Sequence, residues 1–234
     1  MNTLKKLLVL SLFFNFSCTK EELEEIAAGT TPTDGSQTAA QLAGGASLGG
    51  LRCDVETTVG GTYAAVKQLT LNANGTYTYS VFFSNSATCA TAFASGGNNI
   101  ATLYTAGVWA VGGTNTTPST STKIVFVVGS ANMIIRSSTY TATAQPLATW
   151  FNTCSPNPGF NTAADDTQDV AGVACGTSGQ YAAVTIPAAN ATLNNIGYNP
   201  GGGSFSLGNS TGQTVWYPGG SSFPNSYGFT LGFW

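Results

Sequence analysis

The residues best suited to catalysis in this chain are a serine and a group of aspartates, each in a segment rich in small residues. Gly208–Gly212 fits the G-x-S-x-G pattern of a nucleophile elbow, with Ser210 at its centre. A serine nucleophile needs a base to accept its proton, and the chain contains no histidine. In a chain so rich in Ser and Gly the pattern arises by chance, so we predict a non-enzymatic protein.

Asp165, Asp166 and Asp169 form an acidic cluster with Asn161 nearby. Oxygen ligands at this spacing can hold Ca²⁺, but the run lacks the spaced Asp-x-Asp-x-Asp-Gly form of a calcium loop. We therefore expect a solvated loop, with a calcium site as the weaker alternative and no other metal or cofactor. Gly201–Gly203 lacks the Lys-Ser/Thr of a phosphate loop and is read as a turn.

Five cysteines divide into one near the N-terminus and four further along the chain. Cys53, Cys89, Cys154 and Cys175 lack the close pairing of zinc ligands, and an even number in an exported chain indicates disulfides. Four cysteines allow three pairings. We prefer Cys53–Cys89 and Cys154–Cys175, the second of which would close a long irregular loop. Cys18 is then the one cysteine left without a disulfide partner in this assignment.

Aromatic residues make up 11% of the chain and can line a ligand cavity or fill a core. Tyr77, Tyr79 and Trp109 are the candidate ligand-binding residues, because they lie in the segments with the clearest strand pattern. Core packing is the competing interpretation for each of them, as it is for Trp150, Trp216 and Trp234.

Only 7% of the residues are charged, far below the roughly 25% usual for soluble domains. Thr, Ser, Asn and Gly supply a neutral polar surface instead. Nucleic-acid binding needs clustered Lys and Arg, and the whole chain has seven, so no nucleic-acid partner is expected. The aromatic and β-branched content is high enough to bury a core, which argues against disorder.

Residues 1–17 have the pattern of an export signal. Lys5 and Lys6 precede a short apolar run, Leu7–Phe14, which is too short to cross a bilayer. Ser17-Cys18 follows and resembles a lipobox, although Asn15 stands where that motif prefers an aliphatic residue. The resemblance implies that Cys18 is lipidated and becomes the mature N-terminus. The run Cys18–Glu22 also resembles a signal that sends some lipoproteins to the outer surface of the outer membrane.

We divide the chain into a signal peptide (1–17), a lipidated flexible tether (18–50) and a β domain (51–234). The tether has a Glu-rich start and then Ala, Gly, Thr, Ser and Gln with almost no large apolar residue. The protein is expected on a bacterial outer membrane, anchored by lipid and exposed at the cell surface.

Strand patterns recur through the β domain. Asn74-Gly75 lies between two β-rich runs, which is a strong hairpin signal. In 76–83 the apolar residues Tyr77, Tyr79, Val81 and Phe83 alternate with hydroxyl residues, as on a half-buried strand. A second hairpin is predicted from 105–111 and 123–128. Further strands are predicted at 133–140, 180–186, 204–207, 214–217 and 227–234, and one helix at 144–151. An all-β antiparallel barrel or sandwich follows.

Several short segments succeed one another in a characteristic order. They are Gly61–Tyr63, Leu69–Leu71, Gly75–Tyr79, Phe82–Cys89, Ala106–Trp109 and Thr122–Phe126. This succession resembles the bacterial lipocalin-like lipoproteins over about Leu51–Phe151. The resemblance implies a calycin-type, up-and-down β-barrel with an apolar interior and no catalytic residues.

Two functions from different classes remain open. The first is a non-enzymatic, lipid-anchored binding protein that holds a small apolar ligand in the barrel. The second is a surface interaction, adhesion or structural lipoprotein without a ligand cavity, whose neutral loops contact a partner. An outer-membrane barrel, suggested by the aromatic C-terminal segment, is a third alternative.

Overall fold

The computed structural model describes residues 42, 47–56, 63–84, 99–114, 121–198, 204–208, 217–221, 223 and 227–233. Nearly all of its elements are antiparallel strands, as predicted. They are β1 Ser47–Glu56, β2 Tyr63–Asn72, β3 Thr76–Ser84, β4 Asn99–Thr114, β5 Thr122–Arg136, α5 Thr141–Phe151, β6 Asp165–Asp169, β7 Ala174–Cys175, β8 Val184–Thr185, β9 Thr192–Tyr198, β10 Ser204–Gly208 and β11 Tyr227–Phe233.

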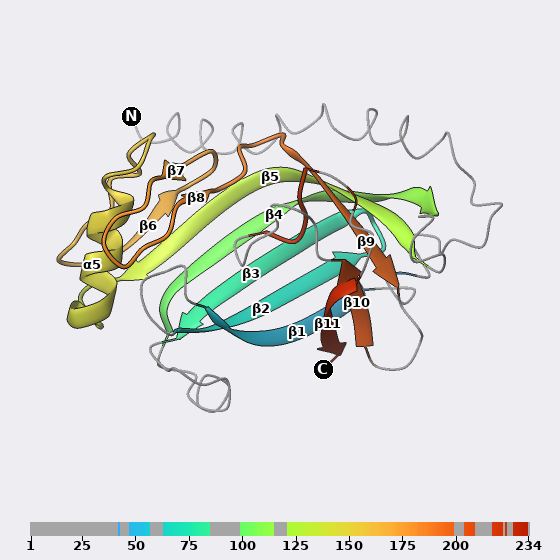
Figure 1. Cartoon of the computed structure of the whole chain (residues 1–234), viewed down its shortest axis with the longest axis horizontal. Coiled ribbons are helices and arrows are strands. Elements are labelled where there is room, and N and C mark those ends of the chain that lie inside the picture. Colours follow the sequence, from blue (N-terminus) through green and yellow to red (C-terminus); the bar gives the residue numbers. More distant parts are fainter. Residues whose placement is uncertain are drawn as a thin grey trace, which may run out of the picture.

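The main sheet curls strongly on itself (Figure 1). Its pairings run in the order β1, β2, β3, β4, β5, β9, β10, β11 and return to β1, so the circuit of strands closes. The long strands β1–β5 pair along most of their lengths and form a half-barrel wall. The opposite side is narrower, because β9 pairs with β10, and β1 with β11, over short registers only.

Asn195 on β9 holds this narrow side together. Its side chain is fully buried, on the same face of β9 as the buried Leu193. The amide nitrogen donates to the Pro218 carbonyl, and Oδ1 accepts from the backbone N–H groups of Ile196 (2.7 Å) and Gly208 (3.0 Å). One buried amide with satisfied hydrogen bonds therefore links β9, β10 and the segment 217–221.

The predicted hairpin between β2 and β3 is confirmed, with a different turn geometry. Gly75 has positive φ (+82°), and its N–H donates to the Asn72 carbonyl at 3.0 Å, whereas Asn74 has an ordinary φ. The side chain of Asn74 instead accepts from the N–H and hydroxyl of Thr76. Only the glycine takes the left-handed conformation here.

The predicted alternation on β3 is also confirmed. Tyr77, Tyr79, Val81 and Phe83 are at most 1% exposed, whereas Thr78 between them is exposed. The facing strands supply further buried side chains in alternation, which is what a sheet curled around its own core requires. These residues belong to one continuous hydrophobic core that extends to α5.

One predicted strand is wrong in its bounds. Residues 133–140 do not begin a new strand, because β5 runs without interruption from Thr122 to Arg136. Its register against β4 shifts at Gly129, so that Val128 pairs with Gly107 and Ser130 with Ala106. This bulge brings Val128 and Ala131 to the same buried face although they are three residues apart.

Other elements differ from the sequence prediction. β1 and β9 were not predicted, and of the strand predicted at 180–186 only Val184–Thr185 forms. The helix is confirmed and begins three residues earlier than predicted, at Thr141. Two features fall within the range predicted as tether: β1 begins at Ser47, and Leu42 is fully buried in the hydrophobic core.

We call α5 and residues 152–187 the capping segment, because in Figure 1 they lie at one end of the long strands. α5 buries Ala144, Leu147, Ala148 and Phe151, the i, i+3, i+4, i+7 stripe of an amphipathic helix. Asn152 follows the helix, and its side chain both donates to and accepts from the backbone of Phe160 at 2.7 Å. The predicted Cys154–Cys175 disulfide is confirmed.

Gly107→Ala is expected to destabilise the protein by about 2 kcal/mol or more, because the new methyl group overpacks the core. Its Cβ would overlap the Val127 carbonyl oxygen and lie 2.9 Å from both Gly129 N and Tyr77 Cε1. Gly112→Ala, on the same strand, meets only ordinary contacts at 3.4 Å or more and is the control. Urea unfolding measures both; equal stability of the two variants would contradict the prediction.

Candidate functional site

The three predicted ligand-binding residues are brought together by β3 and β4, but they are buried in the core. Tyr77 and Tyr79 are 1% exposed and Trp109 is 3% exposed. Tyr77 packs edge-on against Phe126, with ring centroids 5.0 Å apart. The indole N–H of Trp109 donates to the Asn72 carbonyl at 3.0 Å, so this ring anchors the β2–β3 turn. None of the three lines either of the two hollows described below.

The hydroxyl of Tyr77 is a polar group inside this apolar core. It has no hydrogen-bond partner among the described residues, and burial raises the pKa of Tyr77 well above its ordinary value of 10.0. The phenol is therefore neutral throughout the physiological range. Its buried position gives it no role as an acid or base.

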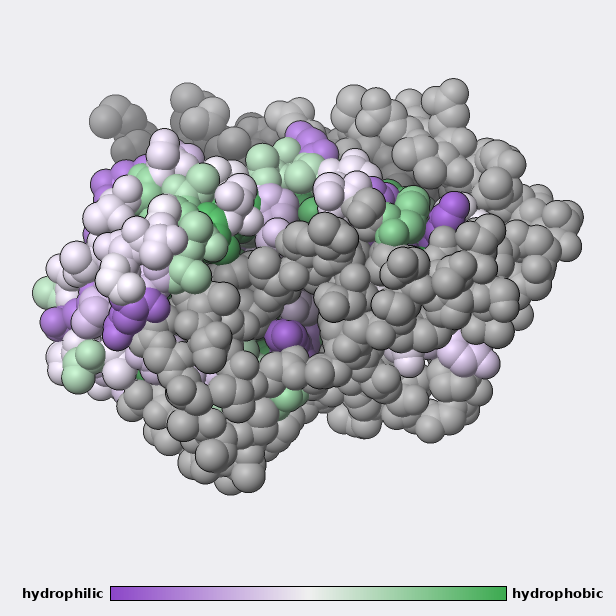
Figure 2. Space-filling view, in the orientation of Figure 1, coloured by the Kyte–Doolittle hydropathy of each residue, from purple (hydrophilic) through white to green (hydrophobic). Residues whose placement is uncertain are grey.

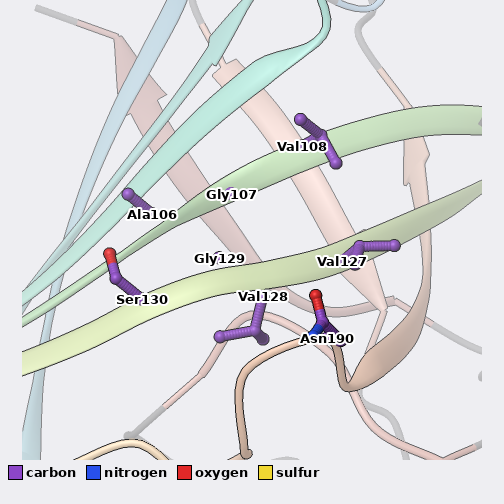
Figure 3. Close-up of a pocket in the computed structure, with 8 residues that line it drawn as sticks. All are labelled: Ala106, Gly107, Val108, Val127, Val128, Gly129, Ser130 and Asn190. Atoms are coloured by element: carbon purple, nitrogen blue, oxygen red, sulfur yellow. The ribbon is translucent and has the colours of Figure 1, made fainter. Parts of the chain in front are cut away.

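An apolar hollow lies instead where β4 and β5 pair around the bulge, and we call it the bulge groove (Figure 3). Its volume is about 280 Å³. Side chains of Ala106, Val108 and Ser130 project to one side of the two strands, whereas that of Val128 projects to the other (Figure 3). The lining of the bulge groove consists of Ala106, Gly107, Val108, Val127, Val128, Gly129, Ser130 and Asn190.

The bulge creates this groove by bringing two glycines to its floor. A Cβ at Gly129 would lie 3.2 Å from the Ala106 carbonyl oxygen, tighter than most real contacts, and Gly107 has no room for one at all. The strands therefore approach closely where they carry no side chains, and the surrounding valines stand above this floor. Sequence reasoning missed the site, although a glycine inside a strand pattern is a known signal of a bulge.

Asn190 forms the polar edge of the groove from a different part of the chain. It has a positive φ of 66°, which Asn tolerates better than most residues, and its side chain is exposed. Its N–H donates to the Val128 carbonyl at 2.7 Å, and the Val128 N–H donates to the Ala191 carbonyl at 3.0 Å. The backbone of Asn190 is thus held beside β5, which places its exposed side chain at the edge of the groove.

The chemistry of the bulge groove is that of binding. Among the described residues of its lining there is no titratable side chain, and Ser130 is the only one of them with a hydroxyl. Apolar walls with a few fixed polar groups are typical of small-molecule sites. The arrangement suits a small apolar ligand that carries one hydrogen-bonding group.

The three aspartates do not converge on a common point. They lie on β6, which corrects the predicted solvated loop, and the described residues contain no group of three potential metal ligands. Asp165 accepts from Ser138 N and Oγ, and Asp169 accepts from Ala171 N. Each carboxylate thus accepts hydrogen bonds from nearby backbone N–H groups.

Asp166 has a further role at the edge of the sheet, where β6 is the last strand in the pairing order. The Val170 N–H donates to the Ala131 carbonyl on β5. Because successive N–H groups along a strand point to alternate sides, the Thr167 N–H points away from β5, toward the open edge of the sheet. Asp166 Oδ1 accepts this N–H at 2.8 Å, while Oδ2 accepts from Asn161 N and Gln168 Nε2. The Thr167 N–H at the edge of the sheet therefore already has a hydrogen-bond acceptor within β6.

Several predicted positions lie outside the described residues. They include Cys18, Cys89 and Ser210. Cys53 is disulfide-bonded, but the pairing with Cys89 stays a prediction. Gly208, the first residue of the elbow pattern, ends β10 and donates its N–H to Asn195, and the rest of the pattern lies outside the described residues.

Acidification is expected to weaken the attachment of β6. Hydrogen bonds from Ser138 and Gln168 lower the pKa values of Asp165 and Asp166 below the ordinary 3.8. Their contribution to stability is therefore complete above the unfolded-state pKa, and is lost as the pH falls below about 4 through the folded-state pKa.

Hydrogen exchange of the β5–β6 amides across about pH 5 to pH 2 measures this effect, after correction for the intrinsic exchange rate. The Asp165→Asn/Asp166→Asn variant is the control, and its protection should depend less on pH. If wild type and variant lose protection in parallel, the assignment to these carboxylates is incorrect.

No described helix is long and apolar enough to cross a membrane. No known protein-family profile matches the chain, and no curated protein sequence does either.

Proposed function

We propose that this protein is an exported, lipocalin-like lipoprotein, anchored to a bacterial outer membrane through Cys18, that binds a small apolar ligand without catalysis. The bulge groove is the single observation that carries the binding proposal. Its valine and alanine walls offer apolar surface, and Ser130 and Asn190 provide hydrogen-bonding groups beside it. Burial of apolar ligand surface drives such binding, and the polar groups orient the ligand.

This location differs from the barrel interior that the sequence suggested. Large side chains occupy the described interior, where Tyr77, Tyr79, Trp109 and Phe126 are at most 3% exposed. A ligand there would have to displace packed aromatic rings, whereas the bulge groove needs no such rearrangement. The volume of the bulge groove is near the lower end of the range found for ligand sites, so the proposed ligand is small.

The order of the strands supports the lipocalin-like assignment. In the closed circuit, β1 to β5 and then β9 to β11 each pair with the next strand of the circuit in chain order. An up-and-down barrel requires this arrangement, and the capping segment is a single insertion between β5 and β9. The low charge and the two disulfide-bonded sites, Cys53 and Cys154–Cys175, fit an exported protein.

Ala106→Phe is expected to fill the groove and abolish binding of the neutral fluorescent probe N-phenyl-1-naphthylamine, measured by fluorescence titration of the purified mature protein. Thr78→Phe is a matched control, because Thr78 is exposed on β3, pairs directly with Ala106, and does not line the groove. Probe binding by wild type and Thr78→Phe, but not by Ala106→Phe, is the expected result. Failure of wild type to bind, or equal binding by all three, would favour a surface interaction protein instead.

Cys18→Ser is expected to abolish incorporation of an alkyne-labelled palmitate in growing bacterial cells and to release the protein from the membrane fraction. A thiol is the group that accepts the lipid, and a serine hydroxyl does not replace it. Ser17→Ala keeps a small residue before the cysteine and should still be labelled. Labelling of the Cys18→Ser protein would refute the anchor, independently of the binding proposal.

A further inference from the structure

A second hollow lies between the exposed face of α5 and the turn formed by Ser178–Tyr181, and we call it the capping groove. Its volume is about 550 Å³. In the space-filling view the described surface at the α5 end is mostly pale, as expected for Thr, Ser and Gly (Figure 2). The lining of the capping groove consists of Thr141, Ala142, Gln145, Pro146, Thr149, Trp150, Thr153, Ser178, Gly179, Gln180 and Tyr181.

The two walls of the capping groove are fixed to each other. Trp150 of α5 stacks on Tyr181 of the turn, with ring centroids 4.7 Å apart and an interplanar angle of 11°. The Trp150 indole donates to the Gly176 carbonyl at 3.1 Å, and Ser178 and Tyr181 exchange two backbone hydrogen bonds of 3.0 Å. The Cys154–Cys175 disulfide joins the segments that follow α5 and precede the turn. A groove with fixed walls costs little ordering entropy on binding.

The described lining carries several neutral polar side chains and no charged one. Thr149 Oγ1 donates to the Gln145 carbonyl and Thr153 Oγ1 to the Trp150 carbonyl, so both hydroxyl oxygens keep lone pairs for an incoming donor. The amide of Gln180 supplies both a donor and an acceptor. An ion would find no counter-charge here, and a purely apolar ligand would leave these groups without partners.

Pro146 adds one more acceptor. It lies inside α5 and has no N–H, so the carbonyl oxygen of Ala142 lacks its usual i+4 donor. Ala142 and Pro146 both line the groove, next to Trp150 and Tyr181. The groove therefore combines hydrogen-bonding groups of both kinds with the exposed apolar side chains of Ala142 and Pro146.

We infer that the capping groove is a binding site for a neutral sugar. A sugar carries hydroxyl groups that both donate and accept, together with C–H faces that pack on apolar rings. That combination matches the neutral threonine and glutamine side chains and the exposed apolar surface of Ala142 and Pro146. The buried, mutually stacked Trp150 and Tyr181 hold the two walls in place. The site is independent of the bulge groove, with which it shares no lining residue.

Titration of the isotope-labelled mature protein with maltose, lactose and N,N′-diacetylchitobiose, followed by NMR chemical shifts, tests this inference. At least one disaccharide is expected to shift resonances of 141–153 and 176–181 selectively, with affinity in about the millimolar range. Gln180→Ala and Gln145→Ala should each weaken that binding about tenfold, the effect of losing one good hydrogen bond.

Gln68→Ala, at a position on β2 outside the groove, is the matched control and should bind as wild type does. Ala106→Phe should also keep the sugar affinity, which separates this site from the proposed apolar one. The inference is overturned if no disaccharide shifts these resonances, if the shifts lie elsewhere, or if both glutamine variants retain wild-type affinity while their spectra show the native fold.

Discussion

The close approach of β4 and β5 at Gly107 and Gly129 is the constraint on which the rest of the described structure depends. At this point two backbones occupy the space that side chains fill elsewhere in the sheet. The resulting bulge lets one uninterrupted strand, β5, keep its apolar residues on the core face before and after Gly129. β5 can then pair with β9 along its first half and β6 along its second, and so connects the barrel wall to the capping segment.

The two hollows arise from different physical causes and offer different chemistry. Missing side chains at a strand bulge make the bulge groove, which is walled by valine and alanine. The capping groove lies between a helix and a turn that are joined by stacked rings, and neutral polar side chains line it. The described lining of each contains no carboxylate or amine side chain, and such surfaces suit recognition of uncharged molecules. The low charge of the whole sequence thus extends to its candidate sites.

Local sequence patterns predicted the fold well in segments where the neighbouring residues alone decide whether a side chain lies on the buried or the exposed face of its strand or helix. The alternation from Tyr77 to Phe83, the Asn74-Gly75 turn and the helix ending at Phe151 were all predictable in this way. β6 was not, because a run of Asp, Thr and Gln forms a strand only when an existing edge, here β5, supplies its hydrogen bonds. The bulge groove was missed for a similar reason: it depends on Asn190 meeting β5 across a long sequence separation.

β6 ends the main sheet with a short strand, and the outward N–H of Thr167 at its centre is already bonded to the neighbouring Asp166. An unprotected edge would be a template for an identical strand from an adjacent copy. This risk is greatest for a protein with little net charge, because electrostatic repulsion between copies is weak. Self-capping by Asp166, with the charged Asp165 and Asp169 exposed beside it, therefore removes one of the edge donors that a strand from a second copy could pair with.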